Sequence, residues 1–305
     1  MNPVAGNGQA CETFSELSKV LQEKLLPFDY QVSNYSGELI SLAKNYGNLA
    51  HPENEILIVI GGDGSLNEVL NGIKTSNHPE TPITYLPAGS GNDFARAAHL
   101  SKKPEELVNR LLQNLDYHPV DCGKSISSLK NNRPYYFVNN FGIGFDAFVV
   151  YSSNHQKMKE KLNKLHLGNL IYASNIINVL CRQDTFSVKV TKDNHILQYD
   201  DVYFVTTTNH PYFGGGFAIL PSANIHSHHL DAVVVQKPSL HKFIRLFAKL
   251  LKDGSHVYDP HFHDIAGSKI EIVTSKPEYG QIDGEDQKKQ KFKVAFQIDS
   301  FNLRQ

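Results

Sequence analysis

The stretch Gly61-Gly62-Asp63-Gly64-Ser65-Leu66-Asn67-Glu68 follows directly after the apolar run 56–60, Ile-Leu-Ile-Val-Ile. An apolar run that ends in glycines and continues into a helical pattern predicts a buried strand followed by a helix. The glycines let backbone N–H groups approach an anion closely, and the helix N-terminus adds a partial positive charge. The stretch therefore predicts a phosphate-binding turn, although an ordinary tight turn between a strand and a helix has the same pattern.

Length and composition limit the class of protein. The chain has 305 residues, which is enough for two domains, and its formal net charge is −1. Such a charge excludes a general electrostatic attraction to nucleic acid or to anionic membranes. The three cysteines have no pairing pattern, and no apolar stretch is long enough to span a bilayer. We therefore expect a cytoplasmic protein.

Histidine is frequent, with fifteen residues, and two clusters invite a metal interpretation. These are Ser227-His228-His229 and His261-Phe262-His263, and neither has the paired Cys/His spacing of a closed zinc site. We expect them to be solvated residues of loops or sheet edges.

The first part of the chain alternates short apolar runs with helical patterns. The helix expected at 13–26 carries Phe14, Leu17, Leu21 and Leu25 on one stripe. This alternation predicts a layered, mainly parallel α/β sheet. The other elements expected here are strands at 30–32, 56–60 and 83–86 and helices at 39–46, at 65–73 and from residue 93.

From about residue 116 strand patterns dominate, which predicts a β-rich sandwich as a second domain. We place the first domain at 1–120 and the second at 121–298, and expect 299–305 to complete the first. The strands are expected at 135–140, 185–190, 202–208, 230–235, 269–273, 279–282 and 292–298, with helices near 165–181 and 239–252.

A second glycine-flexed turn follows the strand at 83–86, in the sequence Pro87-Ala88-Gly89-Ser90-Gly91-Asn92-Asp93-Phe94-Ala95-Arg96. Ser90 can donate to a phosphate oxygen, and Asn92 or Asp93 can cap the next helix. A third glycine-rich segment, residues 2–8, also precedes a helix. Turns at the carboxyl ends of strands in one α/β sheet face the same crevice, where ligands bind.

Together these three segments resemble the diacylglycerol kinase catalytic family, which shares a superfamily with the NAD, sphingosine and ceramide kinases. Further segments fit it at 140–147, at 214–217 with Pro221, and at 282–285. The resemblance covers nearly the whole chain and points to the soluble bacterial lipid kinases. An NAD kinase would share the Gly-Gly-Asp-Gly turn but lack the segment 92–96.

The resemblance implies transfer of the γ-phosphoryl group of ATP to a lipid hydroxyl, typically that of diacylglycerol, giving phosphatidic acid. It implies Mg²⁺ with the ATP, and Asp63 close to the metal-bound phosphates. The residues that it implies for nucleotide binding are Asn2, Pro3, Gly6, Ser33, Gly61, Gly62, Gly64, Ser65, Asn67, Glu68, Gly89 and Ser90.

Two carboxylates of the turn Asp283-Gly284-Glu285 are the candidate general bases. The family match favours Glu285, with Asp283 assisting or exchanging roles, whereas the residues alone also fit a polar hairpin tip. Asp121 matches an acidic position that supports this site in the family, although a surface turn would also explain it. Lys164, within a lysine-rich run, is the candidate phosphate-binding cation, and a solvated helix face is the alternative.

The chain departs from the family pattern twice. A segment Asp-Gly-x-Leu-Asp that helps hold a structural Mg²⁺ is here Ser227-His228-His229-Leu230-Asp231, which leaves only Asp231 as a poor candidate ligand. A strand normally precedes Asn2-Pro3, so we expect the first strand to be missing and an in-frame coding stretch upstream of Met1.

The expected partners are ATP and a lipid at a membrane surface, with no nucleic acid and with peripheral membrane association. The basic amphipathic segment 240–252 either lies on a bilayer or packs on its own domain. A homodimer remains open. The alternative functions are a kinase for another lipid alcohol, a sphingoid base or an NAD-like molecule, and a nucleotide- or lipid-binding regulatory protein without turnover.

Overall fold

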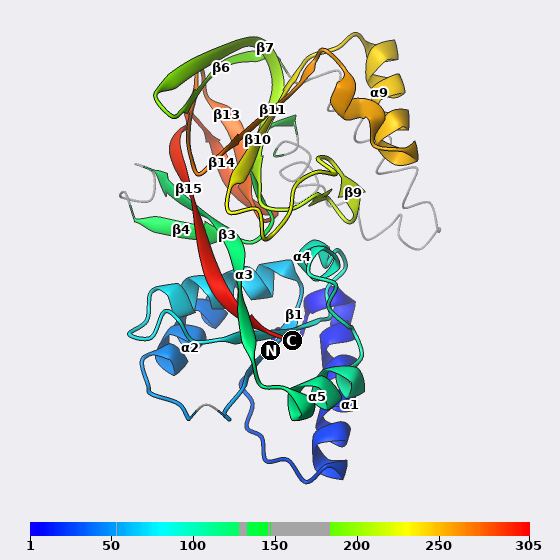
Figure 1. The fold of residues 1–305 in the computed structure, drawn as a ribbon, viewed down its shortest axis with the longest axis vertical. Coiled ribbons are helices and arrows are strands. Elements are labelled where there is room, and N and C mark those ends of the chain that lie inside the picture. The colour runs from blue at the N-terminus through cyan, green and yellow to red at the C-terminus, as the bar shows by residue number, and fades with distance from the viewer. Residues whose placement is uncertain (53, 128–132, 146, 148–183) are drawn as a thin grey trace.

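The computed structural model describes residues 1–305 except 53, 128–132, 146 and 148–183 (Figure 1). Within this part, 13 strands form one sheet that continues from an α/β half into a β-rich half. The two predicted halves are therefore confirmed. The helix expected near 165–181 and the candidate cation Lys164 lie outside the described residues.

The α/β half contains a parallel pair of strands between helices (Figure 1). Leu39 and Leu70 pack on one face of this sheet, and Leu17 and Leu107 pack on the other. Its elements are η1 (Ala5–Gly8), α1 (Gln9–Glu23), α2 (Glu38–Gly47), β1 (Leu57–Gly61), α3 (Asp63–Lys74), β2 (Ile83–Pro87), α4 (Asp93–Ala97) and α5 (Pro104–Gln113).

Two expectations for this half are corrected. The helix α1 begins and ends earlier than predicted, and Leu25 follows it in the left-handed backbone region with 90% of its surface exposed. Its apolar side chain therefore does not belong to the core stripe. The segment 30–32 is not a strand, and α5 was not predicted.

Met1 and Asn2 lie where a sheet strand would lie. The Met1 amino group donates to the Gln31 carbonyl at 2.6 Å, and the Met1 carbonyl accepts the Ser33 N–H at 2.9 Å. On the other side, the Asn2 N–H donates to Ile60 at 3.1 Å. The segment thus bridges residues 31–33 to β1 with sheet-like hydrogen bonds.

The second half consists mainly of antiparallel strands around an apolar core, and each of the seven predicted strands overlaps an observed one. The prediction missed β3, β11 and β14 and the short strands β8 and β9. The elements are β3 (Tyr117–Ser127), β4 (Pro134–Phe137), β5 (Asn140–Gly144), β6 (Phe186–Lys192), β7 (His195–Thr208), β8 (Tyr212–Phe213), β9 (Phe217–Ala218), β10 (Leu230–Gln236), α9 (Leu240–Lys252), η4 (Ser255–Tyr258), β11 (Phe262–Gly267), β12 (Lys269–Thr274), β13 (Glu278–Ile282), β14 (Glu285–Gln290) and β15 (Lys293–Arg304).

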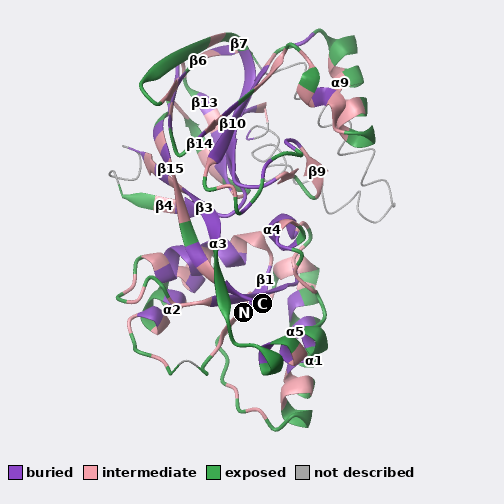
Figure 2. Cartoon of the chain, viewed as in Figure 1, coloured by how far each residue is buried: buried purple, intermediate pink, exposed green. Residues whose placement is uncertain are grey.

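The last strand, β15, connects the two halves. It pairs with β12 and along its length with β3, and then Leu303 and Arg304 pair in parallel with β2. In Figure 1 this strand runs in red from the upper half to the lower half. Figure 2 shows that buried residues follow the central strands, whereas the outer surfaces of α5 and α9 are exposed.

Candidate active site

The three glycine-rich segments meet at the carboxyl ends of β1 and β2. A Cβ built on Gly89 would lie 2.4 Å from the Cα of Gly62, so the two turns touch backbone to backbone. A Cβ on Gly6 would lie 2.3 Å from the Ala88 carbonyl oxygen, and one on Gly61 would lie 3.6 Å from the Cβ of Asn2. Larger residues would separate these segments, because no side chain fits between such backbones.

The second turn is locked by its own asparagine. Asn92 has φ 53°, and its side-chain oxygen accepts the Gly89 N–H at 2.9 Å while its amide donates to the Gly89 carbonyl at 2.7 Å. The Tyr85 hydroxyl, buried below, donates to the Gly61 carbonyl at 3.2 Å. Ser90 is exposed at the tip, so its hydroxyl can reach a ligand.

Asp63 caps the start of α4, a role that the sequence predicted for Asn92 or Asp93. Its carboxylate accepts the backbone N–H groups of Asp93 at 2.9 Å and Phe94 at 3.2 Å. Burial raises the pKa of Asp63 to about 6, and the nearby Asp93 charge adds to the rise. These backbone N–H groups and the Asn139 side chain oppose it. The two phosphate-type turns are thus joined through one carboxylate.

The turn between β13 and β14 carries the other two candidate acids. Asp283 and Gly284 both have positive φ, and Ile282 pairs with Glu285, as in a two-residue hairpin. The polar hairpin tip considered from the sequence is therefore present, but the Asp283 carboxylate points into the protein rather than into solvent.

Asp283 accepts four hydrogen bonds. The donors are the backbone N–H groups of Val138, Asn139 and Asn140 at 2.8–2.9 Å and the side-chain amide of Asn67 at 2.8 Å. Burial raises the pKa of Asp283 to about 6, against the effect of these bonds. A carboxylate has about four lone-pair positions, so its capacity as an acceptor is used.

Glu285 is exposed at the start of β14. Burial is the main cause that raises the pKa of Glu68 and of the Tyr135 hydroxyl, and the charge of Glu285 raises both further. The Tyr135 hydroxyl donates in turn to the Asn67 side-chain oxygen at 2.8 Å. Glu285 therefore lies near α3, which is the helix that begins at the first phosphate-type turn.

Several residues assigned to the nucleotide have protein partners instead. Glu68 accepts the N–H groups of Gly37 at 2.9 Å and Leu39 at 3.2 Å and so caps α2. The Asn67 side chain also donates to the Tyr136 carbonyl. The remaining such contacts are Ser33 Oγ with the Met1 carbonyl and Cys11 Sγ with the Pro3 carbonyl. The Ser65 hydroxyl is different, because it is buried next to Gly61 and has no hydrogen-bond partner among the described residues.

Asn139 lies between the two part-buried acids and was not predicted. Its side chain favours the ionised form of Asp63, its backbone N–H donates to Asp283, and its side-chain oxygen lies 2.7 Å from His210 Nε2. Burial lowers the pKa of His210 to about 3, so this imidazole is neutral and donates from Nε2. The only sequence signal was its position beside the matched segment 140–147.

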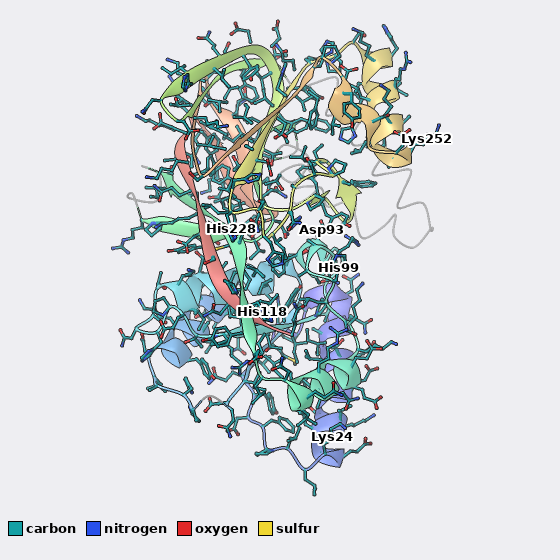
Figure 3. All side chains as sticks on the ribbon, viewed as in Figure 1. Lys24, Asp93, His99, His118, His228 and Lys252 are labelled. Atoms are coloured by element: carbon teal, nitrogen blue, oxygen red, sulfur yellow. The ribbon has the colours of Figure 1, made fainter. Side chains whose placement is uncertain are left out.

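Asp93, predicted only as a possible helix cap, connects the second turn to the β-rich half. Its carboxylate pairs with Arg96 at 2.6 Å and accepts the Gly215 N–H at 2.8 Å. In Figure 3 the labelled Asp93 lies where the two halves of the molecule meet. The glycine turn 214–216, noted only as a family match, thus packs on the start of α4.

Asp121 is buried in β3 and not in a surface turn. Its carboxylate accepts the backbone N–H of His228 at 2.6 Å and lies 3.1 Å from the His228 imidazole, labelled in Figure 3. Ser227 donates to the His229 carbonyl, and Asp231 lies in β10, 3.6 Å from His229 Nε2.

Asp121 and Asp231 thus each lie beside a neighbouring histidine. In the described part of the chain, no group of three or more His, Cys, Asp or Glu side chains is placed to hold a metal ion.

Comparison with protein families gives two matches. Residues 1–125 match the diacylglycerol kinase catalytic domain, and residues 141–299 match the YegS C-terminal NAD kinase beta sandwich-like domain. The second match alone spans more than half of the chain.

Similar proteins extend over most of the chain. A Bacillus subtilis protein named "Putative lipid kinase YtlR" is 28% identical over 262 residues, 84% of this chain and 82% of that protein. A "Diacylglycerol kinase" of the same organism is 27% identical over 289 residues, 93% of this chain and 88% of that protein.

Solved structures agree on the fold. A crystal structure of a diacylglycerol kinase from Bacillus anthracis str. Sterne matches with a TM-score of 0.72 at 22% identity, covering 99% of this chain and 94% of that one. Among the described residues, no helix has the length and apolar character required to cross a membrane.

Proposed function

The chain belongs to the family of lipid kinases that joins a diacylglycerol kinase catalytic domain to a YegS-type C-terminal domain, and on this premise we propose that it phosphorylates diacylglycerol. The reaction moves the γ-phosphoryl group of ATP to the free hydroxyl and gives phosphatidic acid and ADP. One observation carries the proposal. The glycine turns and the hairpin with Glu285 converge on the same helix, α3.

The nucleotide would bind where the three glycine-rich segments meet. The backbone of Gly64 borders open space and the Ser90 hydroxyl is exposed at the tip of the second turn, so both suit contact with phosphate oxygens. Kinases of this family use ATP, and the accompanying Mg²⁺ would neutralise charge on the phosphates. Asp63 is the acid of α3 nearest to that position.

Glu285 is the better candidate for the general base. It is exposed and can accept the proton of a lipid hydroxyl as the oxygen attacks the γ-phosphorus. Asp283 already accepts four hydrogen bonds, so it has no free lone pair for a substrate proton. We infer that Asp283 positions the hairpin and that Glu285 contacts the substrate.

The same contacts support the proposed division into domains. We propose a nucleotide domain of residues 1–120 completed by 299–305, and a lipid domain of residues 121–298. The pairing of Leu303 with β2 supports the first assignment. The bond between Asn67 and Asp283 supports an active site between the domains. We expect a cytoplasmic enzyme that associates peripherally with membranes.

Lipid phosphorylation by the full-length protein tests this proposal. Labelled ATP and Mg²⁺ are supplied with mixed micelles containing diacylglycerol, another lipid alcohol or a sphingoid base. We expect labelled phosphatidic acid as the main product. If a different lipid carries the label, that lipid is the acceptor and not diacylglycerol. If no lipid is labelled in any mixture, the result favours a binding protein without turnover.

The base assignment has a matched control on the same hairpin. Glu285→Gln should lower kcat by roughly 100- to 10,000-fold with an unchanged melting temperature, because the side chain is exposed. Asp286, the next residue, points to the opposite face of β14, so Asp286→Asn should retain activity. Equal activities of the two variants would remove Glu285 from the base role.

A further inference from the structure

The apolar side of α9 is only partly packed. On the inner face, the Phe243 ring lies 6.0 Å from Phe145 and 6.2 Å from Tyr203, and the Phe247 ring lies 6.3 Å from Phe217. These contacts join the helix to the core beneath β9. Packing on its own domain, one of the two interpretations of this segment, therefore accounts for the inner face.

The outer face is apolar as well. Leu240, Ile244 and Leu251 are 54%, 62% and 55% exposed, and their spacing of four and seven residues places them on one side of the helix. Figure 2 shows green, exposed residues along α9. Packing within the described chain leaves this stripe without an explanation.

The polar side of α9 carries charge of a single sign. Lys242, Arg245, Lys249 and Lys252 lie on α9, which contains no Asp or Glu. None of the four lies within salt-bridge distance of a carboxylate in the part of the chain that the structure describes. Lys252, labelled in Figure 3, lies at the end of the helix away from the body of the protein. The nearest acid in sequence is Asp253, just after the helix.

We propose that the outer face of α9 docks on the surface of an anionic lipid bilayer. An amphipathic helix with an apolar stripe and flanking cations lies in the bilayer interface, with its stripe among the acyl chains and its cations at anionic headgroups. A second copy of the chain fits this face less well. A two-fold interface would place the same basic residues against each other, and their charges would repel.

The position of α9 suits the proposed function. The biological purpose of docking rests on that function, because a lipid kinase must reach its substrate in a membrane. The hairpin β8–β9 contacts α9 through Phe217 and contacts α4 through the bond between Gly215 and Asp93. Figure 1 shows α9, β9 and α4 in succession along one side of the molecule. A docked α9 therefore holds that side, which carries the second phosphate-type turn, towards the lipid surface.

Vesicle sedimentation without ATP tests the docking surface directly. The full-length protein is mixed with sucrose-loaded vesicles of phosphatidylcholine alone, or of equal amounts of phosphatidylcholine and phosphatidylglycerol. We expect binding to the anionic vesicles only. Ile244→Glu combined with Leu251→Glu should abolish it, and Lys242→Gln, Arg245→Gln and Lys252→Gln together should weaken it on the order of a hundredfold.

The controls use exposed residues far from α9. Leu112→Glu on α5, where the side chain is 56% exposed, should bind anionic vesicles as the unchanged protein does. The same is expected of the pair Lys19→Gln, on α1, and Lys24→Gln, just after α1. All variants should keep the melting temperature, since the altered side chains face solvent.

Two results would overturn the docking surface. One is undiminished vesicle binding by the α9 variants. The other is a dimer in sedimentation velocity that Ile244→Glu with Leu251→Glu disrupts while vesicle binding persists. If vesicle binding depends on α9 but the protein phosphorylates no lipid, the docking surface is upheld and only the proposed kinase reaction is rejected.

Discussion

The side-chain amide of Asn67 donates a 2.8 Å hydrogen bond to the carboxylate of Asp283, which lies 216 positions further along the chain. Asn67 belongs to the helix that starts at the first glycine turn, and Asp283 belongs to the hairpin that carries Glu285. This bond therefore fixes the distance between the proposed nucleotide site and the proposed base.

Replacing Asp283 by asparagine should affect stability as well as turnover. An amide offers one oxygen where the carboxylate accepts four bonds, and its N–H₂ group faces N–H donors. We expect Asp283→Asn to lower the free energy of unfolding by about 2–4 kcal/mol, measured by chemical denaturation. A variant as stable as the unchanged protein would contradict the four-donor arrangement.

The contact between the glycine turns predicts contrasting effects of two alanine substitutions. Gly89→Ala would put its Cβ against Gly62, and this overpacking should lower the free energy of unfolding by roughly 1–3 kcal/mol. The affinity for a non-hydrolysable ATP analogue, measured by calorimetry, should fall with it. Gly64→Ala places its Cβ in open space and should leave the melting temperature close to that of the parent.

The raised pKa of Asp63 predicts how stability depends on pH. Its native pKa of about 6 lies above the ordinary value of about 3.9, so the native state holds this proton more tightly than the unfolded chain. The contribution of Asp63 to the free energy of unfolding is therefore greatest below about pH 4, and falls by about 3 kcal/mol as pH rises to about 6. Denaturation at several pH values should show this slope, and Asp63→Asn should reduce it.

Asn139 should act on the reaction through Asp63. Its side chain favours the ionised form of that acid, so Asn139→Ala should raise the pKa of Asp63 further. We expect kcat/KM to fall below about pH 6 in the parent enzyme and the midpoint of this fall to move to higher pH in the variant. A lower rate with an unmoved midpoint would indicate general structural damage instead.

Metal removal should not destabilise the protein in the absence of ATP. Asp121 is bound by His228, and Ser227 and Asp231 have other neighbours, so no structural cation is required there. The melting temperature should be the same with Mg²⁺ and with a chelator. Asp121→Ala, which leaves the His228 N–H without its acceptor, should lower it. A chelator-sensitive melting temperature would reveal a cation site.

Local patterns sufficed for the elements that carry the glycine turns. The run 56–60 and the helical pattern after it correspond to β1 and α3, and 83–86 corresponds to β2. Glycine, apolar periodicity and helix starts are properties of neighbouring residues, which explains this agreement. The strand β3 was missed because its polar sequence has no alternation, and its pairing with β15 and β4 determines its conformation.

The site was less accessible from the sequence than the turns were. Asp283 and Asn67 were singled out by motif, yet their hydrogen bond depends on folding of segments far apart in the chain. Asn139 and Asp93 act through buried contacts that leave no local pattern. Leu25 fitted a helical stripe but lies beyond the end of α1, because an apolar period does not indicate where a helix stops.

The pairing of β15 with β2 has a consequence for synthesis. Domains generally begin to fold while the chain is still emerging from the ribosome. Here Leu303, 1% exposed, supplies the neighbour that β2 requires, and it is translated 220 residues after its partner Ile83. The edge of β2 therefore stays open to mispairing while those residues are synthesised, which makes the nascent chain a candidate for chaperone protection.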